Sequence, residues 1–163
     1  MKIKGPKGER TVPVDQFFIG PSRTILEKEE MLLEIAVPKP SPRSLGVYLK
    51  LAPRHSMDLA IVGVAALGVC VDGICKDIRI GLGAVAPTPL RARKAEALLR
   101  GQKPTIEIIE EAARVAGTGC SPINDHRASA EYRCDMVYVL TRRALKQVLV
   151  QQGGSDGTDT YNR

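Results

Sequence analysis

Tryptophan is absent from this 163-residue sequence, and aromatic residues make up only 4% of it. A hydrophobic core of this composition must therefore be aliphatic, built from Ile, Leu, Val and Ala. Hydrophobic residues account for 44% of the chain and charged residues for 26%, which is ordinary for a globular protein. These values exclude a wholly disordered chain and leave room for one domain, or a small domain with a fragment of another.

Residues that carry enzyme chemistry are few. The two histidines, His55 and His126, stand in no metal-binding or catalytic-triad spacing. No C-x2-C pair exists to suggest a zinc or redox site, and we interpret the cysteines as small hydrophobic residues. The motif Gly81-Leu82-Gly83 has no third glycine opening a helix, so it does not indicate a dinucleotide site. We expect these glycines to let a helix pack closely on a strand. The cysteines are Cys70, Cys75, Cys120 and Cys134.

Long hydrophobic runs are also missing. No apolar run reaches the 18 residues of a membrane span, and the first ten residues, MKIKGPKGER, lack the apolar segment of a secretory leader. We therefore expect a cytoplasmic protein without a membrane contact. The net charge is +6, but the basic residues are scattered, which favours solvated faces or a protein interface over nucleic-acid binding.

The middle of the chain predicts a buried hairpin. Residues 59–71 form an apolar strand, Asp72-Gly73 is a strong turn signal, and residues 74–86 alternate. The alternation places Ile78, Ile80, Leu82 and Ala84 on one face of the second strand. Cys70 and Cys75 flank the turn and could face each other across it.

Three helices are predicted after the hairpin, at about 89–101, 104–117 and 128–151. Together with the hairpin they predict an α+β fold, a small antiparallel sheet packed with about three helices. We interpret Arg133 as an interface or capping residue. The second helix is expected to bury Ile108, Ala112 and Val115. The third is expected to bury Tyr132, Met136, Leu140, Ala144 and Val148.

The first third of the chain predicts only short elements. GERTVPVDQFF indicates a strand and a helical turn with Asp15 as N-cap, and EEMLLEIAVPKPSP indicates a strand ended by prolines. GVYLKL predicts another short strand. Such segments cannot form a core by themselves, so this region resembles the end of a domain. The Gly-rich tail, residues 153–163, is expected to be disordered.

Three segments carry a resemblance to a known family. YLKLAPRHSMDLAIVGVAA, IRIGLGAVAPTPLRARKAEALLRG and DHRASAEYRCDMVYVLTRRAL resemble the C-terminal half of the FAD-binding medium subunit of molybdenum hydroxylases, the carbon monoxide dehydrogenase and xanthine dehydrogenase family. The resemblance implies a remnant of the FAD-binding (PCMH-type) domain at residues 1–55. It implies a CO dehydrogenase flavoprotein C-terminal domain at residues 56–152.

The resemblance also implies a function and a set of site residues. In these oxidoreductases a molybdenum-pterin large subunit oxidises the substrate, an iron–sulfur small subunit relays electrons, and FAD on the medium subunit passes them to an acceptor. Molybdopterin and the [2Fe-2S] clusters lie on the partner subunits. Leu32 and Lys50 match positions that contact the isoalloxazine ring, and Asp58 lies in the segment passing the ring edge. Arg54 is a weaker candidate for a phosphate or a neighbouring subunit.

One departure from the family pattern concerns FAD retention. The family's flavin domain carries A-G-G-x-S/T and T-x-G-G segments whose amides cradle the pyrophosphate, and neither occurs here. The sequence therefore predicts a truncated or split medium subunit that does not hold FAD tightly alone and needs a separate FAD-domain chain. The alternative is a non-catalytic interaction module that uses the C-terminal domain as a docking surface. Nucleic-acid binding, a third reading, rests on charge alone.

Overall fold

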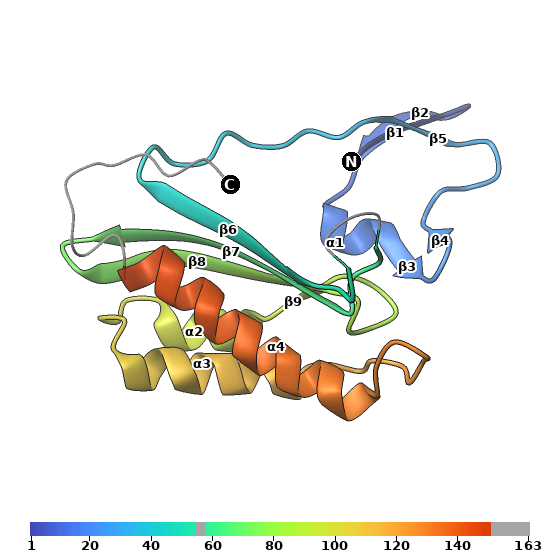
Figure 1. Cartoon of the computed structure of the whole chain (residues 1–163). Coiled ribbons are helices and arrows are strands. Elements are labelled where there is room, and N and C mark those ends of the chain that lie inside the picture. Colours follow the sequence, from blue (N-terminus) through green and yellow to red (C-terminus); the bar gives the residue numbers. More distant parts are fainter. Residues whose placement is uncertain (55–57, 151–163) are drawn as a thin grey trace.

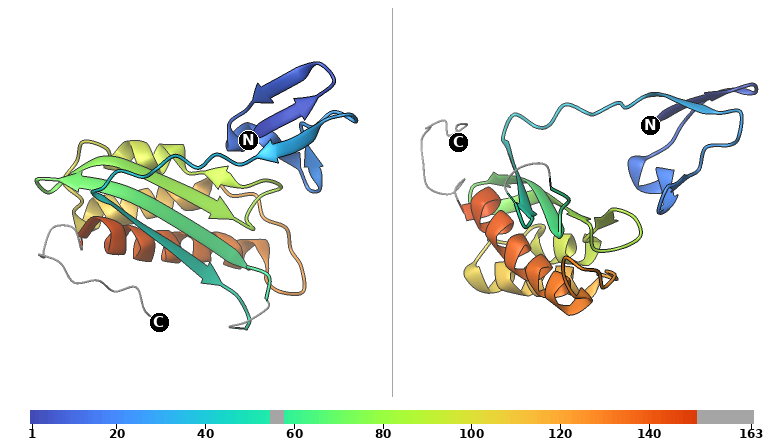
Figure 2. Two further views of the ribbon diagram at one scale, coloured as in Figure 1. Left: turned by 90° about the horizontal axis from the view of Figure 1, so that it is seen from above. Right: turned by 45° about the vertical axis from the view of Figure 1, so that its right-hand side comes forward.

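The structure, a computed structural model, describes residues 1–54 and 58–150. It consists of a four-stranded sheet with helices on one face, preceded by a small N-terminal lobe, residues 1–43 (Figure 1). The lobe lies on the side of the sheet that the helices leave uncovered (Figure 2). The predicted α+β fold class is confirmed.

The main sheet contains β6 (Ser44–Leu51), β7 (Val62–Val71), β8 (Ile74–Gly83) and β9 (Leu90–Arg91), in that order and all antiparallel. The predicted hairpin is β7 and β8. Its turn residues Asp72 and Gly73 have φ values of 52° and 73°, as a tight primed turn requires. Cys70 lies opposite Cys75 in the register, as predicted.

Three α-helices cover one face of this sheet: α2 (Arg93–Leu99), α3 (Ile106–Thr118) and α4 (Ala130–Leu145). A π-helical turn, η1 (Lys146–Val150), extends α4. The hydroxyls of Thr105 and Ser129 cap α3 and α4 by accepting the amides of Ile108 and Tyr132. The three predicted helices are therefore present, with the first shortened because β9 takes its expected start.

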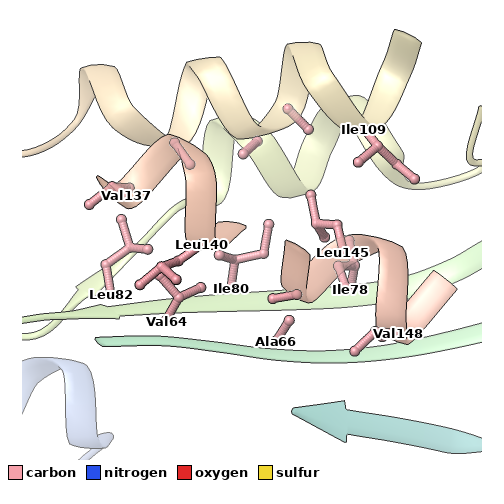
Figure 3. Packing of buried hydrophobic residues seen from close by; sticks show 14 of the residues in the cluster. Val64, Ala66, Ile78, Ile80, Leu82, Ile109, Val137, Leu140, Leu145 and Val148 are labelled. Atoms are coloured by element: carbon pink, nitrogen blue, oxygen red, sulfur yellow. The ribbon is translucent and has the colours of Figure 1, made fainter. Parts of the chain in front are cut away.

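The core lies between the sheet and the helices (Figure 3). Ile78, Ile80 and Leu82 point at the helices, as the alternation predicts. Ala84, expected as a fourth member, lies beyond β8 with φ of 63° and is exposed. Figure 3 also shows Val64 and Ala66 of β7 facing side chains of α3, α4 and η1: Ile109, Val137, Leu140, Leu145 and Val148.

The predicted buried faces of α3 and α4 are partly confirmed, since Leu140, Ala144 and Val148 are buried, as is Ala112. Tyr132 is 44% exposed rather than in the core, whereas Arg133, expected at an interface or cap, is 3% exposed and lies inside. Because Arg133 is charged, the hydrophobic pattern left it out of the buried face of α4. In α3, Ile109, Ala112, Ala113 and Ala116 are buried, while Ile108 and Val115 are only half-buried.

The glycine that permits close helix packing is Gly68 and not the predicted Gly81-Leu82-Gly83 motif. A Cβ added to Gly68 would lie 2.6 Å from Val148 Cγ1, because η1 crosses β7 at this point. A Cβ on Gly81 would meet nothing nearer than Ala65 Cβ at 3.9 Å. Gly81 and Gly83 alternate with buried Leu82, so they lie on the face away from the helices.

The N-terminal lobe contains a three-stranded sheet in the order β2 (Gly8–Thr11), β1 (Lys2–Gly5), β5 (Met31–Glu34). It also holds a one-turn helix, α1 (Val14–Phe17), and the pair β3 (Phe18–Gly20) and β4 (Arg23–Thr24). The prediction that Asp15 caps α1 is wrong, because Pro13 occupies the N-cap. The Asp15 carboxylate instead accepts from Arg93 at 2.6 Å, joining the lobe to α2.

The expected disordered tail, 153–163, lies outside the described residues. Within the ranges 1–54 and 58–150, no helix combines the length and the apolar character needed to cross a bilayer.

Candidate functional site

The face of the main sheet opposite the helices, here called the open face, carries small side chains at one end. The register aligns Lys50 of β6 with Gly63 of β7, and Gly63 with Gly83 of β8. One step along, Tyr48, Ala65 and Gly81 form the next row. Four of these six residues are Gly or Ala, so few side chains rise from this part of the sheet, although Gly63 itself is buried.

A hollow of about 270 Å³ lies between this end of the open face and the N-terminal lobe. Gly63, Ala65, Gly81 and Gly83 form its floor, and its walls come from α1, β3 and the segment leading into β9. The Tyr48 ring lies across Gly63, since a Cβ on Gly63 would be 2.7 Å from the Tyr48 hydroxyl oxygen. Phe18 is a second aromatic ring on the wall.

Lys50 and Asp58 meet at the connection between β6 and β7. The exposed Lys50 Nζ donates to the main-chain oxygen of Asp58 at 2.9 Å. The Asp58 carboxylate accepts the amide of Arg54 at 3.0 Å and that of Leu59 at 2.8 Å. Asp58 therefore organises its own loop, while Lys50 presents its ammonium at the loop's edge. His55 lies outside the described residues.

Leu32 belongs to a different sheet from Lys50. It is half-buried in β5, opposite Ile3 of β1 in the N-terminal lobe. Arg54 Nε lies 3.6 Å from Asp58 Oδ2 and is otherwise exposed. The structure thus brings Lys50, Arg54 and Asp58 together but leaves Leu32 in the lobe, and the assignment of these residues to a flavin stays a prediction.

A buried ion pair behind this site was missed from the sequence. Arg133 Nη1 donates to the Ile61 oxygen at 2.6 Å and to the Ala84 oxygen at 3.2 Å, while Nη2 donates to Asp125 Oδ1 at 2.8 Å. The amide of Arg127 and the guanidinium of Arg133 lower the pKa of Asp125 to about 2. The segment DHRASAEYR contains both Asp125 and Arg133. Its polar character is the only sequence signal that indicates a hydrogen-bonded pair.

A second buried carboxylate, Glu96 of α2, fixes the helix to the sheet. Its Oε1 accepts the Ile80 amide at 2.8 Å and Arg91 Nε at 2.7 Å, and Oε2 lies 3.3 Å from Arg100. Burial raises the pKa of Glu96, but the hydrogen bonds from Arg91 and Ile80 outweigh it and lower the value below 4.5. The Glu96 carboxylate thus takes the place of a strand carbonyl for the Ile80 amide of β8. We assign this network a structural role.

Two of the cysteine thiols, those of Cys75 and Cys120, are poor nucleophiles because their pKa is raised. Burial raises the pKa of Cys75 and of Cys120 to about 11. A thiol must ionise to react, so neither residue is activated at neutral pH.

The comparisons with known proteins agree with this architecture. The family of the CO dehydrogenase flavoprotein C-terminal domain matches residues 47–148. The carbon monoxide dehydrogenase medium chain of Hydrogenophaga pseudoflava is 38% identical over 143 residues, which is 88% of this chain and 50% of that one. The xanthine dehydrogenase FAD-binding subunit of Escherichia coli O157:H7 is 28% identical over 155 residues, 94% of this chain and 53% of that one.

Solved structures of related enzymes share the same fold. Carbon monoxide dehydrogenase from Hydrogenophaga pseudoflava superimposes with a TM-score of 0.88 at 38% identity, covering 93% of this chain and 52% of that one. Quinoline 2-oxidoreductase from Pseudomonas putida 86 gives a TM-score of 0.84 at 28% identity, with 93% and 52% covered. The chain spans about half the length of these relatives. It belongs to the CO dehydrogenase flavoprotein C-terminal domain family and is homologous to the C-terminal half of medium (FAD) subunits of the molybdenum hydroxylases.

Proposed function

We propose that this chain forms one wall of the FAD site in the medium subunit of a molybdenum hydroxylase. It would work in an assembly with a molybdenum-pterin large subunit and an iron–sulfur small subunit. When bound, FAD would take electrons from the iron–sulfur clusters and pass them to an external acceptor. We do not expect the chain to turn over substrate by itself.

The observation that carries this proposal is the position of Lys50. It lies near the end of β6 in the row that contains Gly63 and Gly83, beside the hollow rather than among the residues that line it. The N-terminal lobe lies at the same end of the sheet, toward the β9 edge (Figure 2). An ammonium has three donors, and the Asp58 oxygen uses one of them. The others could donate to a carbonyl of an isoalloxazine ring that lies along the glycine floor.

The residues fit the flavin ring and not the rest of FAD. The hollow is lined mainly by apolar groups, with the Tyr48 ring across Gly63 and the Phe18 ring on its wall. The sequence contains no glycine-rich segment of the kind that cradles a pyrophosphate. The diphosphate and adenosine contacts must therefore come from another lobe.

The N-terminal lobe itself supports completion by further protein. Only Ile3 and Phe17 of its described residues are buried hydrophobic side chains, so the lobe has no core of its own. Several apolar side chains are exposed along it and could be covered by another protein segment. They are Val14, Phe18, Ile19, Met31, Leu33, Ile35 and Val37.

The test is to purify the chain, with an affinity tag, from the cells that produce it, and to measure FAD, molybdenum and iron in the assembly. We expect all three, with FAD near one per chain. We also expect FAD to be lost when the chain is separated from its partners. An assembly with neither flavin nor molybdenum would contradict the proposal. Partners that stay bound equally well after flavin removal, with no metal present, would instead indicate an interaction module.

A further inference from the structure

We infer that Arg133 is a positioning residue for the flavin-facing end of the sheet, acting through the main chain of two strand ends. The effect on flavin binding rests on the proposed function, because the two strand ends flank Lys50. Arg133 itself lies on α4, beneath the sheet, and is 3% exposed, so it acts without touching a ligand on the open face.

The first contact of Arg133 leads to Lys50 through the main chain of Ile61 and Leu51. Its Nη1 donates at 2.6 Å to the oxygen of Ile61, the residue directly before β7. The Ile61 amide donates at 2.8 Å to the oxygen of Leu51, the residue after Lys50. The path from guanidinium to lysine therefore consists of two hydrogen bonds and the peptide groups between them.

The second contact fixes the facing strand. The same Nη1 donates at 3.2 Å to the oxygen of Ala84, directly after β8. Ala84 has φ of 63°, in the left-handed region that a non-glycine residue rarely adopts. Such a conformation persists only where its surroundings hold it. Because Gly63 and Gly83 face each other in the register, one guanidinium spans the two strand ends that frame the glycine floor.

Asp125 orients the guanidinium from the other side. Its Oδ1 accepts Arg133 Nη2 at 2.8 Å and also the amides of Arg127 and Ala128, at 2.9 and 3.2 Å. The carboxylate is thus locked in its own turn before it meets Arg133. A planar guanidinium held at one nitrogen by a carboxylate directs its other nitrogen at two carbonyls in a fixed orientation, which the rotatable ammonium of a lysine does not impose.

Stability alone does not account for this arrangement. A buried ion pair is often no more stabilising than apolar residues of similar volume. The Nε of Arg133 is buried and has no hydrogen-bond partner among the residues that the structure describes. An incompletely satisfied buried guanidinium is better explained by the geometry it imposes on the strand ends than by the energy it contributes.

The test compares Arg133→Lys with two matched variants in the tagged assembly. Arg143→Met removes an exposed arginine from the same helix. Gly68→Ala introduces strain where η1 crosses β7, in the half of that strand away from Gly63, and so reports general destabilisation. We expect Arg133→Lys to weaken FAD binding about tenfold or more and to shift the visible circular dichroism of the flavin. Arg143→Met and Gly68→Ala should retain FAD. Equal FAD loss in Gly68→Ala and Arg133→Lys, at equal loss of thermal stability, would overturn the inference.

A second measurement needs no flavin and separates this inference from the proposed function. In the chain itself, hydrogen exchange at the Ile61 amide should accelerate about tenfold or more in Arg133→Lys and remain unchanged in Arg143→Met. Asp125→Asn, which keeps the side-chain shape, should give a smaller acceleration. If Ile61 stays protected in Arg133→Lys, the inference is wrong even if the assembly contains FAD. If the assembly contains no FAD but Ile61 loses protection, the proposed function fails and the positioning contact stands.

Discussion

At the scale of single residues, Lys50 has the most direct predicted effect on a bound flavin. A cation beside the ring stabilises the negative charge of reduced flavin, so its removal should make reduction harder. Lys50→Met should therefore lower the flavin reduction potential by roughly 5–20 mV, corresponding to an exposed charge interaction of about 0.2–1 kcal/mol. Spectroelectrochemical titration of the assembly measures this shift.

The matched control for Lys50 is Lys76→Met. Lys76 is an exposed lysine of β8 near the hairpin turn, at the other end of the sheet. The control removes the same charge without approaching the proposed flavin position, and its potential should equal that of the wild type. An unchanged potential in Lys50→Met would remove this lysine from the site.

Thr141 offers a stability prediction that is independent of the cofactor. It is fully buried in α4, and its hydroxyl has no hydrogen-bond partner within the described part of the chain. Because an unsatisfied buried hydroxyl is destabilising, Thr141→Val should raise the free energy of unfolding by about 1 kcal/mol. Urea denaturation measures the change. Thr118→Val is the contrast, since the Thr118 hydroxyl donates to the Val115 oxygen at 2.8 Å and its loss should not stabilise.

At the scale of elements, two glycines on opposite faces of the main sheet should respond differently to a methyl group. Gly68→Ala forces a Cβ against Val148, Ile78 and Leu149 and should destabilise the protein by about 1–3 kcal/mol. A Cβ at Gly81 would make only an ordinary contact, 3.9 Å from Ala65 Cβ, so Gly81→Ala should change stability by less than about 0.5 kcal/mol. Thermal denaturation of the chain distinguishes the two. Equal effects would mean that η1 does not pack on β7 as the structure has it.

At the scale of the whole molecule, the two parts should differ in local stability. The main sheet encloses an extensive aliphatic core, whereas the N-terminal lobe has only Ile3 and Phe17 buried among its described residues. In the isolated chain, amides of β1, β2 and β5 should exchange by local opening, and those of β7 and β8 only by global unfolding. Hydrogen exchange followed by mass spectrometry measures both.

Assembly with partner subunits should reduce the difference in local stability between the N-terminal lobe and the main sheet. If the remaining part of an FAD domain covers the exposed apolar side chains of the lobe, then β5 should gain protection in the assembly while β7 and β8 change little. Protection of β5 that is already complete in the isolated chain would contradict the view that the lobe is unfinished. The exposed ion pair between Asp15 and Arg93 is too weak to provide such protection by itself.

The predictions that succeeded from sequence relied on local signals. Asp72-Gly73 defined a hairpin because few residues adopt positive φ there, and Ile78, Ile80 and Leu82 revealed a strand with one buried face. The burial of Arg133 on α4 could not be predicted in this way. Burial of Arg133 depends on acceptors at Ile61, Ala84 and Asp125, two of which are distant in sequence.

The sequence by itself determined the α+β class, the hairpin, the three helices and the family resemblance, because turn chemistry, periodicity and motifs are local properties of the chain. Only the tertiary structure decided which end of the open face carries the small residues, that Asp58 holds its own loop, and that Arg133 spans two strand ends. These features need partners brought together by folding. A hydrogen bond between distant residues leaves no periodic trace in either segment.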